Sequence, residues 1–216
     1  MATQRVIIVL AAGRGSRFVA ASHKLAAPFG EEGVLARTLR HAIASNMPVV
    51  VVTTEPFADL ARSSIAARDV VVLPEVGVAG DHPTKALGMG RSISAGVQAR
   101  PHADGWLVLP GDMPLVRPAT MQAVARELDR HSVVYAQHGG RRGHPVGFGA
   151  ELFSELIELS GDQGARRLVA RYPAIGLEVD DPGILIDIDT VDDLDAALRD
   201  AANPGPPPEE ASRFRR

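Results

Sequence analysis

The segment from Arg5 to Leu10 constrains the fold more than any other part of the chain, because after Arg5 it contains only Val, Ile and Leu. A strand with one face in water alternates apolar and polar residues, whereas a strand buried on both faces does not. Strands of the second kind occur mainly in parallel sheets that are covered by helices. Similar short apolar runs follow at Val49 to Val52, Val70 to Leu73 and Trp106 to Leu109.

Longer stretches with helical spacing lie between these runs. One apolar stripe consists of Val34, Leu35, Thr38, Leu39, Ala42 and Ile43, and another of Met121, Val124, Ala125 and Leu128. Strands that alternate with helices predict a layered α/β domain.

The pattern changes after Asp129. We expect a strand at Ser132 to Gln137, a turn from His138 to Gly143 and a return strand at His144 to Phe148, which together form an antiparallel hairpin. The remaining expected elements are helices at Ala150 to Leu159 and Gly164 to Arg171, strands at Ile175 to Val179 and Gly183 to Ile188, and a helix from Val191 to about Ala201.

The length of 216 residues fits one domain, which we expect to span residues 1–202. Residues 203–216 combine Pro-Gly-Pro-Pro-Pro with charged residues and contain almost no core residues. We expect this tail to be disordered.

The composition excludes several classes of protein. The net charge of −3, with only six Phe, two Tyr and one Trp, gives no general reason to bind nucleic acid or a membrane. With no Cys, the chain has no disulfide, thiolate nucleophile or cysteine-ligated zinc. The apolar run from Val6 to Ala12 is too short for a signal or membrane segment. We therefore expect a soluble cytoplasmic protein.

The first candidate site is the loop that follows the first strand, Leu10-Ala11-Ala12-Gly13-Arg14-Gly15-Ser16-Arg17-Phe18. Small residues let the backbone approach a phosphate, and successive N–H groups can cradle the anion. Arg17 and Lys24 would then neutralise a polyphosphate. Neither the dinucleotide fingerprint nor the P-loop pattern is present. The alternative is an ordinary strand-to-helix turn.

Two further candidate sites are acidic. Asp112 directly follows an apolar strand, within Leu-Pro-Gly-Asp-Met-Pro, where a carboxylate can bind a hard cation such as Mg²⁺ or simply cap a turn. Asp187 and Asp189 lie two apart, so on a strand they would point to one face. The alternative for that segment is a helix start, since Thr190 and Asp193 resemble a capping box. Both can hold, because the cap leaves Asp187 and Asp189 free.

Three glycine-containing segments complete the set. Gly88 to Gly96 opens a helix at which the Ser92 hydroxyl could receive a base, ribose or phosphate, or at which small residues could simply pack closely. Gly143-His144-Pro145-Val146 could present an imidazole to a substrate. Gly161-Asp162-Gln163-Gly164-Ala165-Arg166 has the form of a helix start with Asp162 near its N-cap.

Taken in this order, the motifs resemble those of the molybdenum cofactor nucleotidyltransferases, and most closely the cytidylyltransferase branch. The resemblance covers residues 5 to about 200. It implies a nucleotidyltransferase fold of the glycosyltransferase-A type, with three α/β/α layers and a mainly parallel, mixed sheet. It also implies a Mg²⁺-dependent enzyme that transfers CMP from CTP to the phosphate of molybdopterin and releases pyrophosphate.

The resemblance assigns roles to residues. It implies Arg17, Lys24 and Asp112 as catalytic and Asp112, Asp187 and Asp189 as metal ligands. The implied nucleotide-binding residues are Leu10, Ala11, Ala12, Gly13, Gly15, Ser16, Arg17, Lys24, Gly88, Ser92, Gly111 and Asp112. The implied acceptor-binding residues are His144, Pro145, Asp162, Gly164 and Arg166. A transient contact with a molybdoenzyme-maturation protein is also implied.

The form Ala11-Ala12-Gly13 resembles the CTP-using branch, whereas Ala-Gly-Gly is typical of the GTP-using one. The chain departs from the family pattern at Phe18, Val19 and His23, and the spacing from Arg17 to Lys24 is one residue longer. The alternatives are guanylyl transfer to molybdopterin, nucleotidyl transfer to another phosphorylated metabolite, a nucleotide-sugar glycosyltransferase and a non-catalytic nucleotide-binding regulator.

Overall fold

A computed structural model describes residues 4–13, 23–74 and 88–202. The predicted tail, part of the first loop and the segment 75–87 lie outside these ranges. The strands are β1 Val6–Ala11, β2 Pro28–Phe29, β3 Glu32–Gly33, β4 Val49–Thr54, β5 Val70–Leu73, β6 Gly105–Pro110, β7 Val133–His138, β8 Arg141–Gly149 and β9 Ala174–Glu178. The α-helices are α1 Val34–Ala44, α2 Glu55–Arg62, α3 Met89–Gln98, α4 Pro118–Glu127, α5 Phe153–Ile157, α6 Arg166–Arg171 and α7 Val191–Ala202. The 3₁₀ helices are η1 Lys24–Ala26, η2 Ala67–Asp69, η3 Ala150–Leu152 and η4 Pro182–Leu185.

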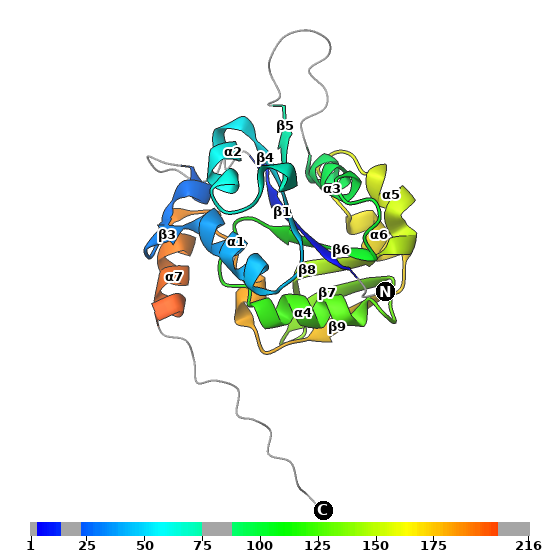
Figure 1. The fold of residues 1–216 in the computed structure, drawn as a ribbon. Helices are drawn as coiled ribbons and strands as arrows, with labels where there is room; N and C mark the ends of the chain where they lie inside the picture. The colour runs from blue at the N-terminus through cyan, green and yellow to red at the C-terminus, as the bar shows by residue number, and fades with distance from the viewer. Residues whose placement is uncertain (1–3, 14–22, 75–87, 203–216) are drawn as a thin grey trace, which may run out of the picture.

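Seven strands form one sheet in the order β5-β4-β1-β6-β8-β7-β9 (Figure 1). β1 pairs in parallel with both β4 and β6, whereas β8 is antiparallel to its two neighbours, β6 and β7. The predicted α/β fold with a mainly parallel, mixed sheet is therefore confirmed, and so is the antiparallel hairpin. Short β2 and β3 form a separate two-stranded sheet.

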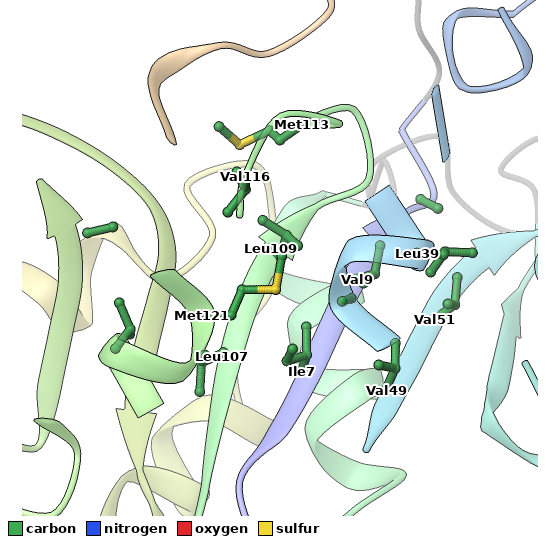
Figure 2. Close-up of a cluster of buried hydrophobic side chains, with 14 of the residues drawn as sticks. Ile7, Val9, Leu39, Val49, Val51, Leu107, Leu109, Met113, Val116 and Met121 are labelled. Carbon is green, nitrogen blue, oxygen red and sulfur yellow. The ribbon is translucent and has the colours of Figure 1, made fainter. Parts of the chain in front are cut away.

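The core lies on both faces of the sheet, as the non-alternating strands predict. Alternate residues of β1 point to opposite sides: Ile7 and Val9 pack with Leu39 of α1 and Met121 of α4 (Figure 2). On the other face, side chains of β1 and β4 pack with residues of α3, α5 and α6, in a cluster that includes Val6, Ile8, Val50, Val52, Ile93, Val97, Leu156 and Leu168. This division produces the three α/β/α layers.

A third, smaller cluster attaches the C-terminal helix. Leu194 and Ala197 of α7 pack with Phe29 of β2, Val34 of α1 and Ile188, all of them buried. The last described helix is therefore fixed to the segment that follows β1, which brings the chain before α7 back to the central strands.

Three predicted details are wrong. The hairpin turn is only Gly139-Gly140, because both residues take the positive φ that a two-residue turn requires and pairing begins at once with His138 and Arg141. Ile43, placed in the buried stripe of α1, is 43% exposed.

The segment Gly183 to Ile188 is not a strand, which is the third error. Residues 182–185 form η4, because Pro182 occupies the first turn and the Asp181 side chain accepts a hydrogen bond from the Gly183 N–H. Residues 186–189 then run without regular secondary structure.

In the described ranges, no helix has the length and apolar character needed to cross a membrane.

Candidate active site

The carboxyl ends of β1 and β6 lie side by side where the strand order reverses. β1 connects through α1 to β4 on one side, while the later strand β6 lies on its other side. Ligands of open α/β sheets bind at such a switch point. The Gly111 N–H donates to the Leu10 carbonyl oxygen at 2.8 Å. A Cβ atom at Gly111 would lie 3.0 Å from that oxygen, so the close approach favours glycine there.

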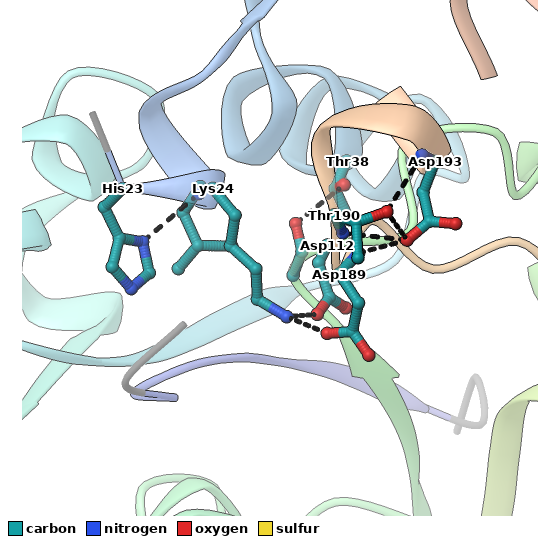
Figure 3. Close-up of polar contacts among 9 residues, drawn as sticks. His23, Lys24, Thr38, Asp112, Asp189, Thr190 and Asp193 are labelled. Atoms are coloured by element: carbon teal, nitrogen blue, oxygen red, sulfur yellow. Dashed lines mark hydrogen bonds and ion pairs between the residues drawn. The ribbon is translucent and has the colours of Figure 1, made fainter. Parts of the chain in front are cut away.

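Lys24 is the centre of a charged cluster at this edge (Figure 3). Its Nζ lies 2.6 Å from Oδ2 of Asp112 and 2.7 Å from Oδ1 of Asp189. Lys24 is only 8% exposed, so its side chain is buried rather than solvated. The structure thus brings together three predicted residues that are far apart in sequence.

The backbone around Lys24 is held by a residue that the sequence analysis did not single out for this role. Nδ1 of His23 accepts a hydrogen bond from the Leu25 N–H at 3.2 Å, which caps η1. The His23 ring also lies against Phe57 of α2, with 4.4 Å between ring centroids. His23 replaces an Asn of the family pattern, and Asn is likewise a good cap, which was the available signal.

Asp189 is held by hydrogen bonds on either side of it. The Ile188 N–H donates to the Asp112 carbonyl oxygen at 2.9 Å, which ties this segment to the loop after β6. The predicted capping box is confirmed: the Asp193 N–H donates to Oγ1 of Thr190, and Oδ2 of Asp193 accepts from the Thr190 N–H. The same Oδ2 accepts from the Asp189 N–H at 3.2 Å. The start of α7 therefore fixes the backbone of Asp189.

Thr38 of α1 supports the loop from the other side. Its Oγ1 donates to the Gly111 carbonyl oxygen at 3.0 Å and to the Val34 carbonyl oxygen at 3.1 Å, and its side chain is fully buried. In the sequence Thr38 stands out only as a member of an apolar stripe, although a polar residue in such a stripe signals a buried hydrogen bond.

The electrostatics of the cluster follow from burial and mutual charge. Burial lowers the pKa of Lys24, but the carboxylates of Asp112 and Asp189 outweigh it and raise the pKa above its ordinary value. Burial, together with the charges of Asp189 and Asp112, raises the pKa of Asp187. The edge thus gathers three acids around one described ammonium, and the surroundings of Asp187 disfavour its carboxylate form.

The carboxylates of Asp112 and Asp189 can supply part of the coordination shell of a divalent cation. Oδ1 of Asp112 is buried and has no hydrogen-bond partner among the described residues. Within the same ranges, no group of three or more His, Asp or Glu side chains is arranged to hold a metal ion. Mg²⁺ is usually held by one or two carboxylates together with waters and substrate phosphates. Asp112 and Asp189 suit a metal whose coordination is completed by the substrate.

His144 lies in β8, two residues from Val146, which is the last residue paired with β6. Its pKa is lowered to about 4, first by burial and also by the charges of Arg142 and Arg166, so the imidazole is neutral at pH 7. Asp187 acts in the opposite direction, which places an acid of the cluster and His144 within electrostatic reach. Buried Pro145 follows through a cis peptide bond.

The start of α3 packs against the predicted acceptor segment. Gly88 is the N-cap, and a Cβ atom there would overlap the backbone of Gly161. The Gly90 N–H donates to the Gly161 carbonyl oxygen at 3.0 Å. Gly164 is buried with φ +53°, and a Cβ atom there would lie 2.9 Å from Sδ of Met89. Two segments that the sequence assigns to nucleotide and acceptor therefore meet.

The other predicted residues are more scattered. Ser92 is 5% exposed on α3, whereas Asp162 and Arg166 are exposed. The predicted cap at Asp162 is wrong, because α6 begins at Arg166 after Ala165, which makes no side-chain cap.

In the first loop, Leu10 and Ala11 end β1, and half-buried Ala12 packs against the apolar cluster on the α3 side. Gly13 is exposed. Gly15, Ser16 and Arg17 lie outside the described residues.

Comparison with known proteins gives several relatives. The chain is 35% identical over 126 residues to the bifunctional protein GlmU of Alkalilimnicola ehrlichii, which covers 57% of this chain and 25% of that protein. It thus spans about a quarter of the length of that relative. It is also 28% identical over 208 residues to the purine catabolism protein PucB of Bacillus subtilis, covering 89% of this chain and 95% of PucB.

Solved structures show the same architecture. Rv0371c of Mycobacterium tuberculosis H37Rv is 30% identical with a TM-score of 0.76, over 92% of this chain and 99% of that one. A manganese complex of Rv0371c is 28% identical with a TM-score of 0.71, over 91% and 99% of the two chains. The molybdopterin-guanine dinucleotide biosynthesis protein A of Archaeoglobus fulgidus has a TM-score of 0.65 over 92% and 99% of the two chains, and at 18% identity it shows the fold alone.

A family model described as the MobA-like NTP transferase domain matches residues 7–175, which include Lys24, Asp112 and His144. Asp187 and Asp189 lie beyond the matched region. The match covers well over half of the chain. This chain belongs to the MobA-like NTP transferase domain family, whose chemistry is nucleotidyl transfer.

Proposed function

We propose that this chain is a cytidylyltransferase that moves CMP from CTP to the phosphate of molybdopterin and releases pyrophosphate. The observation that carries the nucleotidyl-transfer part is the cluster in which Lys24 lies between Asp112 and Asp189 at the switch point of the sheet. The cytidine and the pterin acceptor rest on the resemblance of the sequence motifs.

The reaction needs no nucleophile from the protein. A phosphate oxygen of the acceptor attacks the α-phosphorus of the nucleotide, a new P–O bond forms, and the bond to the β-phosphate breaks with the electron pair leaving on pyrophosphate. Catalysis then depends on positioning and charge neutralisation.

Asp112 and Asp189 would hold a divalent cation, and the manganese complex of Rv0371c supports this part of the proposal. When bound, the cation would supply charge neutralisation at the α-phosphate and the leaving group. Lys24 would place its ammonium against the phosphates, because a flexible four-carbon stem carries a movable point charge.

The acceptor side of the proposal comprises His144, Pro145, Asp162, Gly164 and Arg166. A neutral imidazole at His144 can both donate and accept a hydrogen bond, and Arg166 is an exposed cation close enough to influence His144. Both properties suit a polar acceptor that carries a phosphate.

The preference for cytidine is assigned to Ala12. Its methyl group packs toward the α3 side of the sheet, directly after β1, where the first loop begins. A methyl group at this point takes room that a larger purine base would use. Ala12→Gly should therefore relax the preference for CTP over GTP.

The test is pyrophosphate release from CTP, GTP, ATP and UTP, each with molybdopterin and with a panel of sugar 1-phosphates as acceptors. We expect release only when molybdopterin is present, with CTP preferred over GTP in direct competition. Asp112→Asn measured in parallel separates enzyme turnover from contaminating phosphatases.

Other outcomes identify the alternatives. A preference for GTP with molybdopterin would move the chain to guanylyl transfer. Pyrophosphate release with a sugar phosphate, and not with molybdopterin, would show that the acceptor is a sugar phosphate while the reaction is still nucleotidyl transfer. No release from any pair, by folded protein with Mg²⁺ or Mn²⁺, would reject the proposed reaction.

A further inference from the structure

Lys24 occupies the space between two carboxylates that a metal ion would need. Its ammonium is 2.6 Å from one oxygen of Asp112 and 2.7 Å from one oxygen of Asp189 (Figure 3). Both acids and the lysine are largely buried, with side-chain exposures of 16%, 19% and 11%. An ion pair screened so little by water is a strong competitor for any other cation at the same oxygens.

A divalent cation at Asp112 and Asp189 would lie next to that ammonium, and the two cations would repel each other at low dielectric. The described residues offer the metal two acids and no third side chain grouped with them in a metal-binding arrangement. The ammonium, in contrast, can move, because His23 and Phe57 fix the backbone of η1 while the four-carbon side chain remains the adjustable part.

We propose that Lys24 is the resident counter-ion of the Asp112–Asp189 pair and excludes the divalent cation until a nucleoside triphosphate arrives. The triphosphate gives the ammonium a new anionic partner and gives the metal its missing oxygen ligands, so metal and nucleotide bind as a pair. The triphosphate step rests on the proposed function, whereas the competition between ammonium and metal does not.

The first test measures Mn²⁺ binding without nucleotide, by electron paramagnetic resonance of the free ion. Lys24→Met keeps the length of the side chain and removes its charge. We expect it to bind Mn²⁺ about tenfold more tightly than the unaltered protein, within the range of typical coupling between sites. Arg62→Met is the matched control, since it removes one exposed positive charge from α2 and should change Mn²⁺ binding by less than about twofold.

A double variant tests whether the tighter Mn²⁺ binding arises at the Asp112–Asp189 pair. Adding Asp189→Asn to Lys24→Met should abolish the tighter binding, because one of the two ligands is lost. Unchanged or weaker Mn²⁺ binding by Lys24→Met, or a gain that survives Asp189→Asn, would overturn the proposal.

The unaltered protein provides a measurement that does not depend on a variant folding. The sequence contains only two lysines, Lys24 and Lys85, so ¹⁵N-lysine labelling gives two ammonium signals. The Lys24 signal, assigned with Lys24→Arg, should stay in place with Mg²⁺ alone and shift when Mg²⁺ and CTP are added together.

A shift with Mg²⁺ alone would mean that the metal enters without nucleotide, which rejects the proposal. If Lys24→Met gains Mn²⁺ affinity but no nucleoside triphosphate moves the Lys24 signal, the competition stands. The nucleotide part of the proposed function then fails on its own.

Discussion

Two carboxylates, those of Asp181 and Asp112, are held in opposite ways. Asp181 is 2% exposed, and its oxygens accept hydrogen bonds from the Arg117 N–H at 2.9 Å, Oγ1 of Thr120 at 2.6 Å and the Gly183 N–H at 3.2 Å. Asp112 shares one oxygen with the Lys24 ammonium, while its other oxygen is buried without a hydrogen-bond partner among the described residues.

The difference separates an acid whose hydrogen bonds hold neighbouring elements together from the acid that we propose as a ligand of the substrate complex. The bonds of Asp181 come from backbone and hydroxyl groups that cannot leave, so they stabilise η4 and the start of α4. Among the described residues, Asp112 contacts one movable cation and keeps a second oxygen without a hydrogen-bond partner. An unsatisfied buried polar atom is costly to stability and is retained where it serves a ligand.

The largest expected effect is on turnover. Asp112→Asn removes the charge that holds Lys24 and the proposed metal, and we expect kcat to fall at least about a hundredfold while the melting temperature changes little. Steady-state pyrophosphate release and thermal unfolding check both parts. Asp59→Asn, at an exposed position of α2, is the control. Near-normal turnover with normal Mg²⁺ dependence would remove Asp112 from the site.

Asp181→Asn should lower stability and leave turnover nearly unchanged, the reverse of Asp112→Asn. The new amide NH₂ would face donors, so buried hydrogen bonds are lost and the free energy of unfolding should fall by about 2 kcal/mol. Urea denaturation measures this, and kcat per folded molecule should change by less than about threefold. If turnover fell as much as in Asp112→Asn with stability intact, the distinction between the two acids would collapse.

Lys24→Ala should lower kcat about tenfold and weaken nucleotide binding less, because the charge that the ammonium meets grows as pyrophosphate leaves. Lys24→Arg should recover only part of the loss, since a rigid guanidinium fits two carboxylates differently from a point charge. Single-turnover rates measure the effect on the chemical step, and equilibrium CTP binding measures the effect on nucleotide affinity. A kcat within about twofold of normal would show that Lys24 does not act on the phosphates.

The smallest expected effect is a pH dependence of stability at His41 of α1, which contacts the segment between β6 and α4. Nδ1 of His41 lies 2.9 Å from the Val116 carbonyl oxygen and donates to it when protonated. Burial, with the charges of Arg37 and Arg40, lowers the pKa of His41 despite that hydrogen bond.

The lowered pKa sets the sign of the effect. The unfolded chain takes up a proton at His41 as pH falls through about 6.5, while the folded protein resists it to lower pH. Stability from neutral His41 is therefore present above pH 6.5 and is lost on acidification. His41→Gln should lose less stability than the unaltered protein between pH 7 and pH 5 in urea titrations. An equal loss in both would exclude His41 as a contributor.

Local patterns predicted the sheet and its helices well, because apolar runs and helical stripes can be recognised within a single segment. The capping box of Thr190 and Asp193 was predictable for the same reason. The segment after Asp181 was not, because apolar Ile184, Leu185 and Ile186 suit a strand, and only the tertiary contacts of Asp181 make η4 the better solution.

The candidate site was predictable as a set of residues but not as an arrangement. Motifs identified Lys24, Asp112 and Asp189 individually, each at the end of a recognisable element. Nothing in their spacing indicates that the ammonium lies between the two acids, because that contact depends on how α7 docks. Thr38 was missed as a support because its hydrogen bond to the Gly111 carbonyl oxygen joins residues that only the fold brings near. His23 was missed although its partner, the Leu25 N–H, is only two residues away.

The capping box at the start of α7 has a consequence for the order in which the site is completed during synthesis. Lys24 and Asp112 are synthesised long before Asp189, and the backbone of Asp189 is fixed only when Asp193 is in place. A chain synthesised only as far as Asp181 therefore contains Lys24 and Asp112 but lacks the second carboxylate of the cluster. The complete Lys24 cluster forms only after the residues that begin α7 have been added.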